Sequence, residues 1–397
     1  MKKFIPIILP FLAAIIITAC NTEEGLEPAS QNSYIKIIQG LGSDNPLKIE
    51  ALDDGTLLIV SNSLIRGQGE NVEKIRVLKV NINGTVLDEK YFPENINQNW
   101  IARDMIVLPD NKITIGGALR NENREDTSLV VFTIDANNLD SIASQTYNSD
   151  AETYNMSGLS YDQNSSKILF GGSEIRSGNV EFTVYGEMNA NDLSDLQTFK
   201  SDKVRALPAT AFYKDNNGVL SWAYNSETST LSRSNDRRLN VIDESEDLDF
   251  ENAENIRTKK LIVTEEGEIL LFGETNEPNE PTKIFYYKVF SGNNEVVFGE
   301  PGNNTLNGAK KIDGGYLITG STEILVQGAN AHSDFLLSRR GQNGAEVFTD
   351  SFGSDANEQL HDATMVNDKI YAIGSTILGI DNTLLLIKTN KFGKLEN

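Results

Sequence analysis

The sequence predicts an all-β fold, a seven-bladed β-propeller of four-stranded antiparallel blades spanning residues 33–397. A unit of about fifty residues recurs along the chain. In each copy an acidic or amide turn, usually with glycine, precedes a short apolar run and then a small residue, most clearly in residues 311–322. The small residue recurs at intervals of 47 to 56 positions, as Val60, Gly116, Gly171, Ala223, Gly273, Gly320 and Gly374. Seven copies at this period indicate a propeller or a solenoid.

The second half of each unit favours the propeller. Alternating apolar segments flank Asn83-Gly84 in one copy and Asn343-Gly344 in another. Asn-Gly between alternating segments predicts a two-residue hairpin turn in which both central residues have positive φ. Each unit then holds about four short strands and shows no helical period. Four-stranded sheets repeated around a ring leave only short, protected edges.

The two ends of the repeat region indicate how such a ring closes. Residues 34–44 match residues 347–355, which form the fourth strand and exit turn of the sixth copy. The seventh copy runs through residues 384–393 and then stops without a fourth strand. We therefore expect the N-terminal strand to complete the last blade, an exchange that a solenoid does not need.

The first twenty residues predict export and lipidation. Lys2 and Lys3 precede an apolar run over residues 4–18 that is too short for a membrane span. The ending Ile17-Thr18-Ala19-Cys20 resembles a bacterial lipobox. This resemblance implies that residues 1–19 are a lipoprotein signal peptide and that Cys20 is acylated, for example with palmitate, after cleavage.

Residues 20–32 are polar and contain glycine and proline, which predicts a flexible tether between the lipid and the propeller. Glu23 and Glu24 follow the lipidated cysteine and resemble the surface-export signal of Bacteroidota lipoproteins. The resemblance implies an outer-membrane protein that faces the medium, with the periplasmic face as the alternative. We expect the closing blade to lie nearest the membrane.

Composition excludes several classes of partner and site. The formal charge is −22, and removal of the two signal-peptide lysines makes it −24. Such a charge excludes nucleic acid as a partner and excludes electrostatic adhesion to anionic lipid, so the membrane is reached through the acyl chain alone. Cys20 is the sole cysteine, so the mature chain forms no intrachain disulfide.

Three short motifs resemble the divergent propeller repeats of secreted and lipid-anchored Bacteroidota proteins. They are Asp313-Gly314-Gly315-Tyr316, Gly320-Ser321-Thr322 and Ile387-Lys388-Thr389-Asn390. The resemblance covers nearly the whole mature chain, is strongest in the last two copies and is weakest in the fourth. It implies a propeller lipoprotein, while the Trp-Asp and sialidase-type signatures of other propellers are missing.

The sequence predicts no catalytic residue, metal ligand or cofactor. His332 and His361 lack the spacing of a zinc site, and we interpret His361-Asp362 as a polar surface pair, with the central channel as the alternative. The chain contains neither a Gly-x-Ser-x-Gly elbow nor a phosphate-binding glycine loop. Acidic turns at residues 135–140 and 215–218 leave Ca²⁺ open, but turns closed by Asx side chains explain them more simply.

An acidic run distinguishes the fourth copy. Its carboxylates are Asp243, Glu244, Glu246, Asp247 and Asp249. A solvated loop is the simplest interpretation, and a loop that binds a partner protein or a cation is the alternative.

These observations favour a non-enzymatic surface lipoprotein whose propeller is a platform for interaction or ligand binding. We expect it to be an accessory to an outer-membrane transporter or assembly complex. The alternative is a glycan-binding or carbohydrate-active propeller enzyme. The absence of every catalytic motif sought, together with a fold whose loops suit binding, favours the platform.

Overall fold

The structure is a computed structural model. It describes residues 33–66, 71–95, 98–121, 125–147, 153–176, 180–205, 209–214, 220–225, 229–234, 243–247, 255–263, 268–288, 295–324 and 331–396. The predicted signal peptide and tether, with Cys20, Glu23 and Glu24, lie outside the described residues, as does Asp249. The described residues contain no helix long and apolar enough to cross a membrane.

The described residues form four-stranded antiparallel sheets, each built from strands that follow one another in the chain, except that β1 joins the last sheet. Sheet by sheet, the strands are β2 (Ser43–Ala51), β3 (Leu57–Arg66), β4 (Asn71–Val80) and β5 (Val86–Phe92); β6 (Asn99–Leu108), β7 (Lys112–Arg120), β8 (Asp126–Asp135) and β9 (Ser141–Tyr147); β10 (Thr153–Asp162), β11 (Lys167–Arg176), β12 (Val180–Asn189) and β13 (Gln197–Arg205); β14 (Ala209–Lys214), β15 (Leu220–Asn225), β16 (Ser229–Ser234) and β17 (Asp243–Asp247); β18 (Asn255–Val263), β19 (Ile269–Asn276), β20 (Lys283–Lys288) and β21 (Glu295–Phe298); β22 (Asn304–Ile312), β23 (Gly315–Ile324), β24 (His332–Gly341) and β25 (Glu346–Phe352); and β26 (Glu358–Val366), β27 (Lys369–Leu378), β28 (Asp381–Asn390) and β1 (Tyr34–Ile38).

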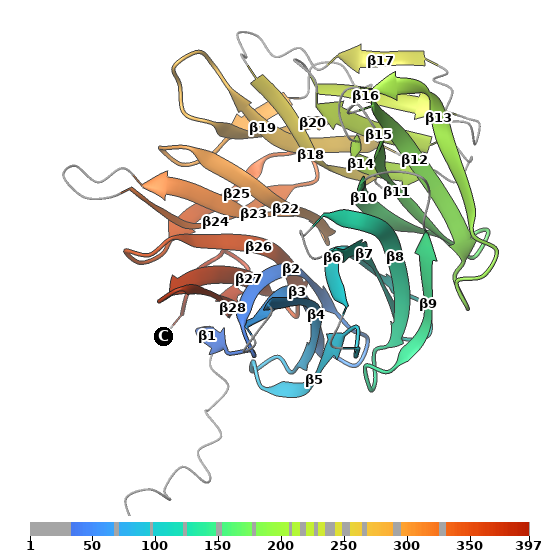
Figure 1. Cartoon of the computed structure of the whole chain (residues 1–397). Coiled ribbons are helices and arrows are strands. Elements are labelled where there is room, and N and C mark those ends of the chain that lie inside the picture. Colours follow the sequence, from blue (N-terminus) through green and yellow to red (C-terminus); the bar gives the residue numbers. More distant parts are fainter. Residues whose placement is uncertain are drawn as a thin grey trace, which may run out of the picture.

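The sheets stand around a common centre, with their first strands innermost and fourth strands such as β5, β9 and β17 at the rim (Figure 1). The first strands of neighbouring sheets contact one another in an unbroken cycle: β2, β6, β10, β14, β18, β22, β26 and β2 again. Side chains are described in every sheet except that of β14–β17, which is defined by its backbone pairing. The predicted all-β propeller of four-stranded antiparallel blades is confirmed.

The predicted closure by the N-terminal strand is also confirmed. Strand β1 pairs antiparallel with β28, in a register that runs from Tyr34 opposite Lys388 to Ile38 opposite Leu384. The Ser33 hydroxyl donates to the carbonyl of Glu396 at 2.5 Å, so the chain enters the ring beside its C-terminal segment. Backbone pairing between the two ends of the repeat region therefore holds the ring shut.

The two ends of the ring carry different connections. The turn face holds the turns between third and fourth strands, such as residues 81–85 and 341–345, and the turn at residues 390–394 that follows β28. The loop face, at the opposite end, holds the connections between second and third strands, such as residues 378–381. Both names are used in this sense below.

The hydrophobic core lies between neighbouring sheets. Strand β3 reads LLIVS over five consecutive buried positions, because one face packs on the preceding sheet and the other on the following sheet. At the closure, Ile49 and Leu57 pack with Tyr371 and Leu386, and Ile38 of β1 joins this cluster. Burying one such side chain stabilises the fold by about 1.5–3 kcal/mol.

Glycine in the second strand permits close backbone packing. A Cβ atom at Gly320 would lie 1.8 Å from the carbonyl oxygen of Thr305 in the neighbouring first strand. At Gly273 the corresponding contact, with the carbonyl oxygen of Arg257, would be 2.1 Å. Any larger residue would push the first strand toward the centre of the ring.

The predicted geometry of the Asn-Gly turns is wrong. At residues 81–85, positive φ belongs to Gly84, at 76°, and not to Asn83. The Asn81 side chain organises the turn, because its Oδ1 accepts hydrogen bonds from the backbone N–H groups of Asn83 and Thr85, each at 2.9 Å. The connection spans the five residues 81–85 and not two, with glycine only at the position that needs it.

Candidate functional site

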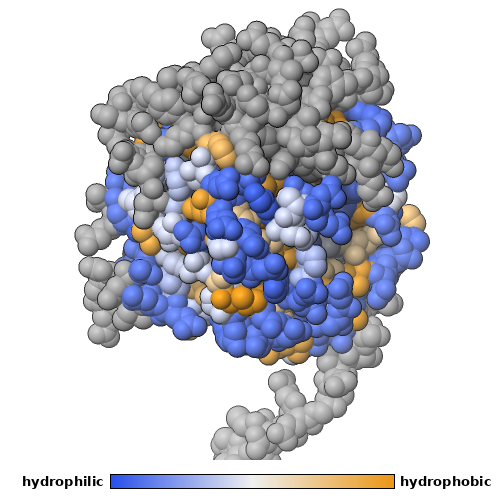
Figure 2. Space-filling model, turned by 90° about the vertical axis from the view of Figure 1, so that its right-hand side faces the viewer, coloured by the Kyte–Doolittle hydropathy of each residue, from blue (hydrophilic) through white to orange (hydrophobic). Residues whose placement is uncertain are grey.

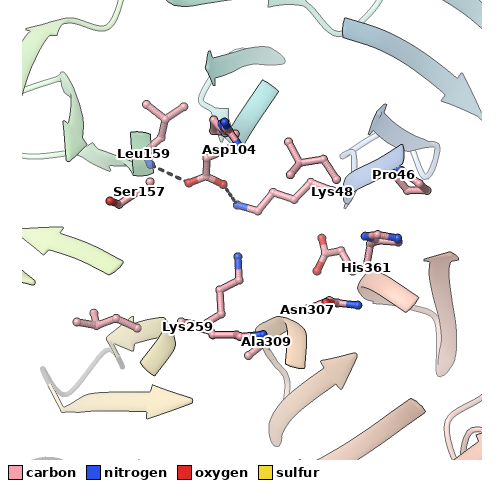
Figure 3. Close-up of a pocket in the computed structure, with 16 residues that line it drawn as sticks. Pro46, Lys48, Asp104, Ser157, Leu159, Lys259, Asn307, Ala309 and His361 are labelled. Atoms are coloured by element: carbon pink, nitrogen blue, oxygen red, sulfur yellow. Dashed lines mark hydrogen bonds and ion pairs between the residues drawn. The ribbon is translucent and has the colours of Figure 1, made fainter. Parts of the chain in front are cut away.

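A cavity of about 290 Å³ lies at the centre of the ring. The described part of its lining comes from six first strands, which are β2, β6, β10, β18, β22 and β26. Figure 3 shows Lys48 and Asp104 on one side of this space and Asn307 and His361 on another. Concave sites of this kind are where propellers and other folds bind small molecules.

A repeated irregularity of the backbone positions the lining residues. In every sheet the pairing of the first and second strands shifts by one residue, at the same place in the first strand. The extra residue is Leu47, Arg103, Ser157, Thr210, Lys259, Asn307 or His361, and the residue that follows is Lys48, Asp104, Gly158, Ala211, Lys260, Gly308 or Asp362. Such bulges re-aim side chains and are common near functional sites. The sequence analysis did not predict them.

Asp104 ties three blades together. Its Oδ1 lies 2.5 Å from the ammonium of Lys48, and its Oδ2 accepts a hydrogen bond at 2.7 Å from the backbone N–H of Leu159 (Figure 3). Burial by itself raises the pKa of Asp104, but Lys48, Lys260 and the bond from Leu159 outweigh burial, so the pKa lies below its usual value. Asp104 is therefore an ionised strut between β2, β6 and β10.

Asp362 makes a second tie, across the closure of the ring. Its Oδ2 accepts a hydrogen bond at 3.1 Å from the backbone N–H of Ile49. Lys310 lies 3.4 Å from the same oxygen and 2.9 Å from Glu50. These contacts join β22, β26 and β2, so both carboxylates that line the cavity satisfy backbone groups of the next blade.

Lys259 and Glu274 make the tie between β18 and β22. The Lys259 ammonium lies 2.6 Å from Glu274 Oε1 and donates to the carbonyl of Leu306 at 3.2 Å. Glu274 Oε1 also accepts a hydrogen bond from the backbone N–H of Leu306 at 2.7 Å. The adjacent Lys260 also lines the cavity, and burial lowers its pKa.

His361 lines the cavity, so its interpretation as part of a surface pair is wrong. Burial lowers the pKa of His361 to about 4, although the nearby Asp362 opposes this shift. Nε2 of the ring lies 2.9 Å from the hydroxyl of Ser375, and the imidazole is therefore neutral at pH 7. His332 is remote from the cavity, on β24, with Nε2 3.4 Å from Asp334 Oδ1.

The acidic run of the fourth copy does not form the predicted loop over its described part. Asp243, Glu244, Glu246 and Asp247 lie in β17, the fourth strand of its sheet (Figure 1). The register pairs Asp243 with Arg233 and Asp247 with Thr230. Backbone pairing with β16 overrides the low strand propensity of acidic residues here. Binding of a partner or cation by this strand stays a prediction.

No group of three or more His, Cys, Asp or Glu residues that could hold a metal ion occurs in the described part of the chain. The acidic turn at residues 135–140 is closed by its own side chains. The backbone N–H of Asn137 donates to Asp135 Oδ1 at 2.7 Å, and that of Asp140 donates to Asn138 Oδ1 at 2.9 Å. The second acidic turn, residues 215–218, lies outside the described residues.

No protein-family model and no curated protein matches the chain. Solved structures are similar in fold. The propeller domain of the Trilobed protease from Pyrococcus furiosus, described as having an open velcro topology, is 12% identical over 90% of this chain and 98% of that one, with a TM-score of 0.50. A chain of the COPII outer coat vertex on membranes is 10% identical over 87% of this chain and 84% of that one, with a TM-score of 0.52. These similarities show the propeller fold and nothing more specific.

Proposed function

We propose that the chain is an exported Bacteroidota lipoprotein, anchored through Cys20 in the outer membrane and exposed at the cell surface. Its seven-bladed propeller is a non-catalytic binding platform, an accessory to an outer-membrane transporter or assembly complex. The lipobox-like Cys20 and the acidic Glu23 and Glu24 support the location. The unbroken cycle of first strands supports the blade number.

One observation carries the non-catalytic role: the two carboxylates in the described lining of the cavity are engaged as struts. Asp104 and Asp362 each accept a hydrogen bond from a backbone N–H of the next blade. A glycosidase needs one carboxyl group with a raised pKa to act as general acid, whereas the pKa of Asp104 is lowered. The described lining also contains no phenylalanine, tyrosine or tryptophan, the side chains on which sugars usually stack. These features support the platform over the carbohydrate-active alternative.

The entry of β1 supports a defined orientation. The Tyr34 hydroxyl donates to the carbonyl of Ile82 at 3.1 Å, and Lys36 reaches the carbonyl of Asn83, so β1 begins at the turn face. A tether that ends there holds the turn face toward the membrane and directs the loop face away from it. This orientation replaces the simpler expectation that one blade lies nearest the membrane.

The loop face carries an exposed apolar hairpin suited to a partner. Ile380, at the tip between β27 and β28, is 79% exposed, and Ile377 and Leu378 beside it are also exposed. Elsewhere apolar side chains form small separate groups on a largely hydrophilic surface, as one side of the molecule shows (Figure 2). Exposed apolar groups rimmed by polar residues are typical of contact sites.

Co-purification tests the platform. The full chain, expressed in a Bacteroidota host, is cross-linked on intact cells and purified from detergent extracts. We expect a reproducible outer-membrane partner that is lost in Ile380→Asp and retained in Phe392→Asp, a matched change at the turn face. Labelling with a palmitate analogue, absent in Cys20→Ala, checks the anchor. The absence of a reproducible partner, or partner loss only in Phe392→Asp, contradicts the proposal.

A further inference from the structure

The charges that follow the bulges are unevenly distributed around the cavity. In ring order these positions are Lys48, Asp104, Gly158, Ala211, Lys260, Gly308 and Asp362. Lys48 stands between the two aspartates and pairs with Asp104 at 2.5 Å. Lys260 stands between Ala211 and Gly308, neither of which has a side chain that could neutralise it.

Lys260 has no ion-pair or hydrogen-bond partner among the described residues. The neighbouring Lys259, by contrast, pairs with Glu274 at 2.6 Å. The strands on either side of β18 contain no aspartate or glutamate, since β14 reads ATAFYK and β22 reads NTLNGAKKI. The first strands that flank Lys260 therefore offer it no carboxylate.

An unpaired ammonium in this position is costly. Burial lowers the pKa of Lys260, and the nearby Lys48 and Lys259 lower it further, while Asp104 and Asp362 oppose the shift. Buried charges in proteins are normally paired or engaged in binding. Lys260 also borders a cavity of about 290 Å³, so there is space for a ligand beside its ammonium.

We propose that the central cavity binds a small monoanionic carboxylate, which the Lys260 ammonium holds by a charge-assisted hydrogen bond. The inference rests on the proposed binding role and names a ligand class for it. The volume admits a small molecule at the lower limit of ligand pockets. Asp104 and Asp362 line the same space, so a singly charged anion is favoured over phosphate, which is largely doubly charged at neutral pH.

Nuclear magnetic resonance of the full chain in detergent micelles tests the site. Trifluoroacetate, followed through its ¹⁹F signal, is the carboxylate probe, and orthophosphate, followed through ³¹P, is the comparison. We expect saturable binding of trifluoroacetate, weaker binding of phosphate, and affinity for trifluoroacetate about 10- to 100-fold lower in Lys260→Gln. The control is Lys369→Gln, because Lys369 pairs with Glu396 at the surface; it should bind like the unmodified chain.

A stability measurement makes the test independent of folding defects. Lys260→Gln removes a partly buried ammonium that has no partner among the described residues, so it should unfold at the same temperature as the unmodified chain or at a higher one. Equal affinity of Lys260→Gln and the unmodified chain, or no saturable binding of trifluoroacetate, overturns the site. A markedly lower unfolding temperature also overturns it, because Lys260 then has a structural partner. Co-purification of a partner by Lys260→Gln leaves the platform intact even if the anion site fails.

Discussion

Arg76 connects the closing strand to the first blade, and its removal should destabilise the ring. The guanidinium is fully buried, with Nη1 2.5 Å from Asp44 Oδ2 and Nε 2.8 Å from Glu89 Oε1. Nη2 donates to the carbonyl of Gln39 at 2.8 Å, just after β1 ends. One side chain thus joins β4 to the segment that leads from the closing strand into β2.

The variant Arg76→Met keeps the apolar volume and removes the charge. Asp44, with a side chain only 1% exposed, is then left without its guanidinium partner. Because burial already raises the pKa of Asp44, its carboxyl group must either stay buried as an unpaired anion or take up a proton. Breaking a buried pair by removing one partner costs about 3–5 kcal/mol, so we expect the free energy of unfolding to fall by that amount. Urea denaturation at pH 7, followed by tryptophan fluorescence and circular dichroism, measures the change.

A second substitution separates the charge effect from lost packing. Asp44→Asn in the Arg76→Met background removes the carboxyl group that lost its partner and should recover about half of the loss or more. The control is Arg66→Met, because Arg66 pairs with Asp381 across the same two blades but both side chains are substantially exposed. It should cost about 0–1 kcal/mol. A loss below about 1 kcal/mol in Arg76→Met, or no recovery in the double variant, refutes the argument.

Three further predictions follow from burial and titration. Ile38→Ala should lower the unfolding free energy by about 2–5 kcal/mol in urea titrations, because Ile38 is 5% exposed in the core at the ring closure. Asp104→Asn should cost about 3 kcal/mol at pH 7 by the same assay. Since the folded pKa of Asp104 is lowered, its contribution to the unfolding free energy is present above about pH 4 and is lost as the pH falls through the folded value. If Asp104→Asn loses stability at acidic pH just as the unmodified chain does, this reasoning is contradicted. His361 is neutral in the fold down to about pH 4 but protonates near pH 6.5 when the chain is unfolded. The free energy of unfolding should therefore fall by up to about 3 kcal/mol as the pH is lowered from about 6.5 to about 4. His361→Gln should remove this slope, as thermal unfolding at a series of pH values will show.

The repeat and its closure could be predicted because they depend on patterns that backbone physics makes visible. A four-stranded sheet packed on both sides requires short apolar runs and turn residues at a fixed period, which the seven copies show. The match between residues 34–44 and 347–355 identified β1 as a fourth strand. The acidic strand β17 was predicted as a loop, because pairing with β16 is a tertiary effect that its composition conceals.

The cavity residues were missed because a bulge adds a single residue and leaves the alternation of apolar and polar positions almost unchanged. A signal was nevertheless present. Aligning the copies on their small residues places Lys48, Asp104, Lys260 and Asp362 twelve or thirteen positions before Val60, Gly116, Gly273 and Gly374. A charged residue at the same aligned position in four copies indicates that this position faces a polar space at the centre of the ring.

The arrangement of the struts gives the strongest reason to regard Lys260 as functional. A propeller must satisfy polar backbone groups where neighbouring first strands diverge, and Asp104 and Asp362 do so at two junctions. At the junction of β18 and β22 the backbone groups of Leu306 are satisfied by Glu274 and by Lys259, the residue directly before Lys260. Lys260 is therefore not needed to close the ring. Among the described residues no hydrogen bond or ion pair of Lys260 joins two blades, and a negatively charged group that enters the cavity from outside would give its ammonium a partner.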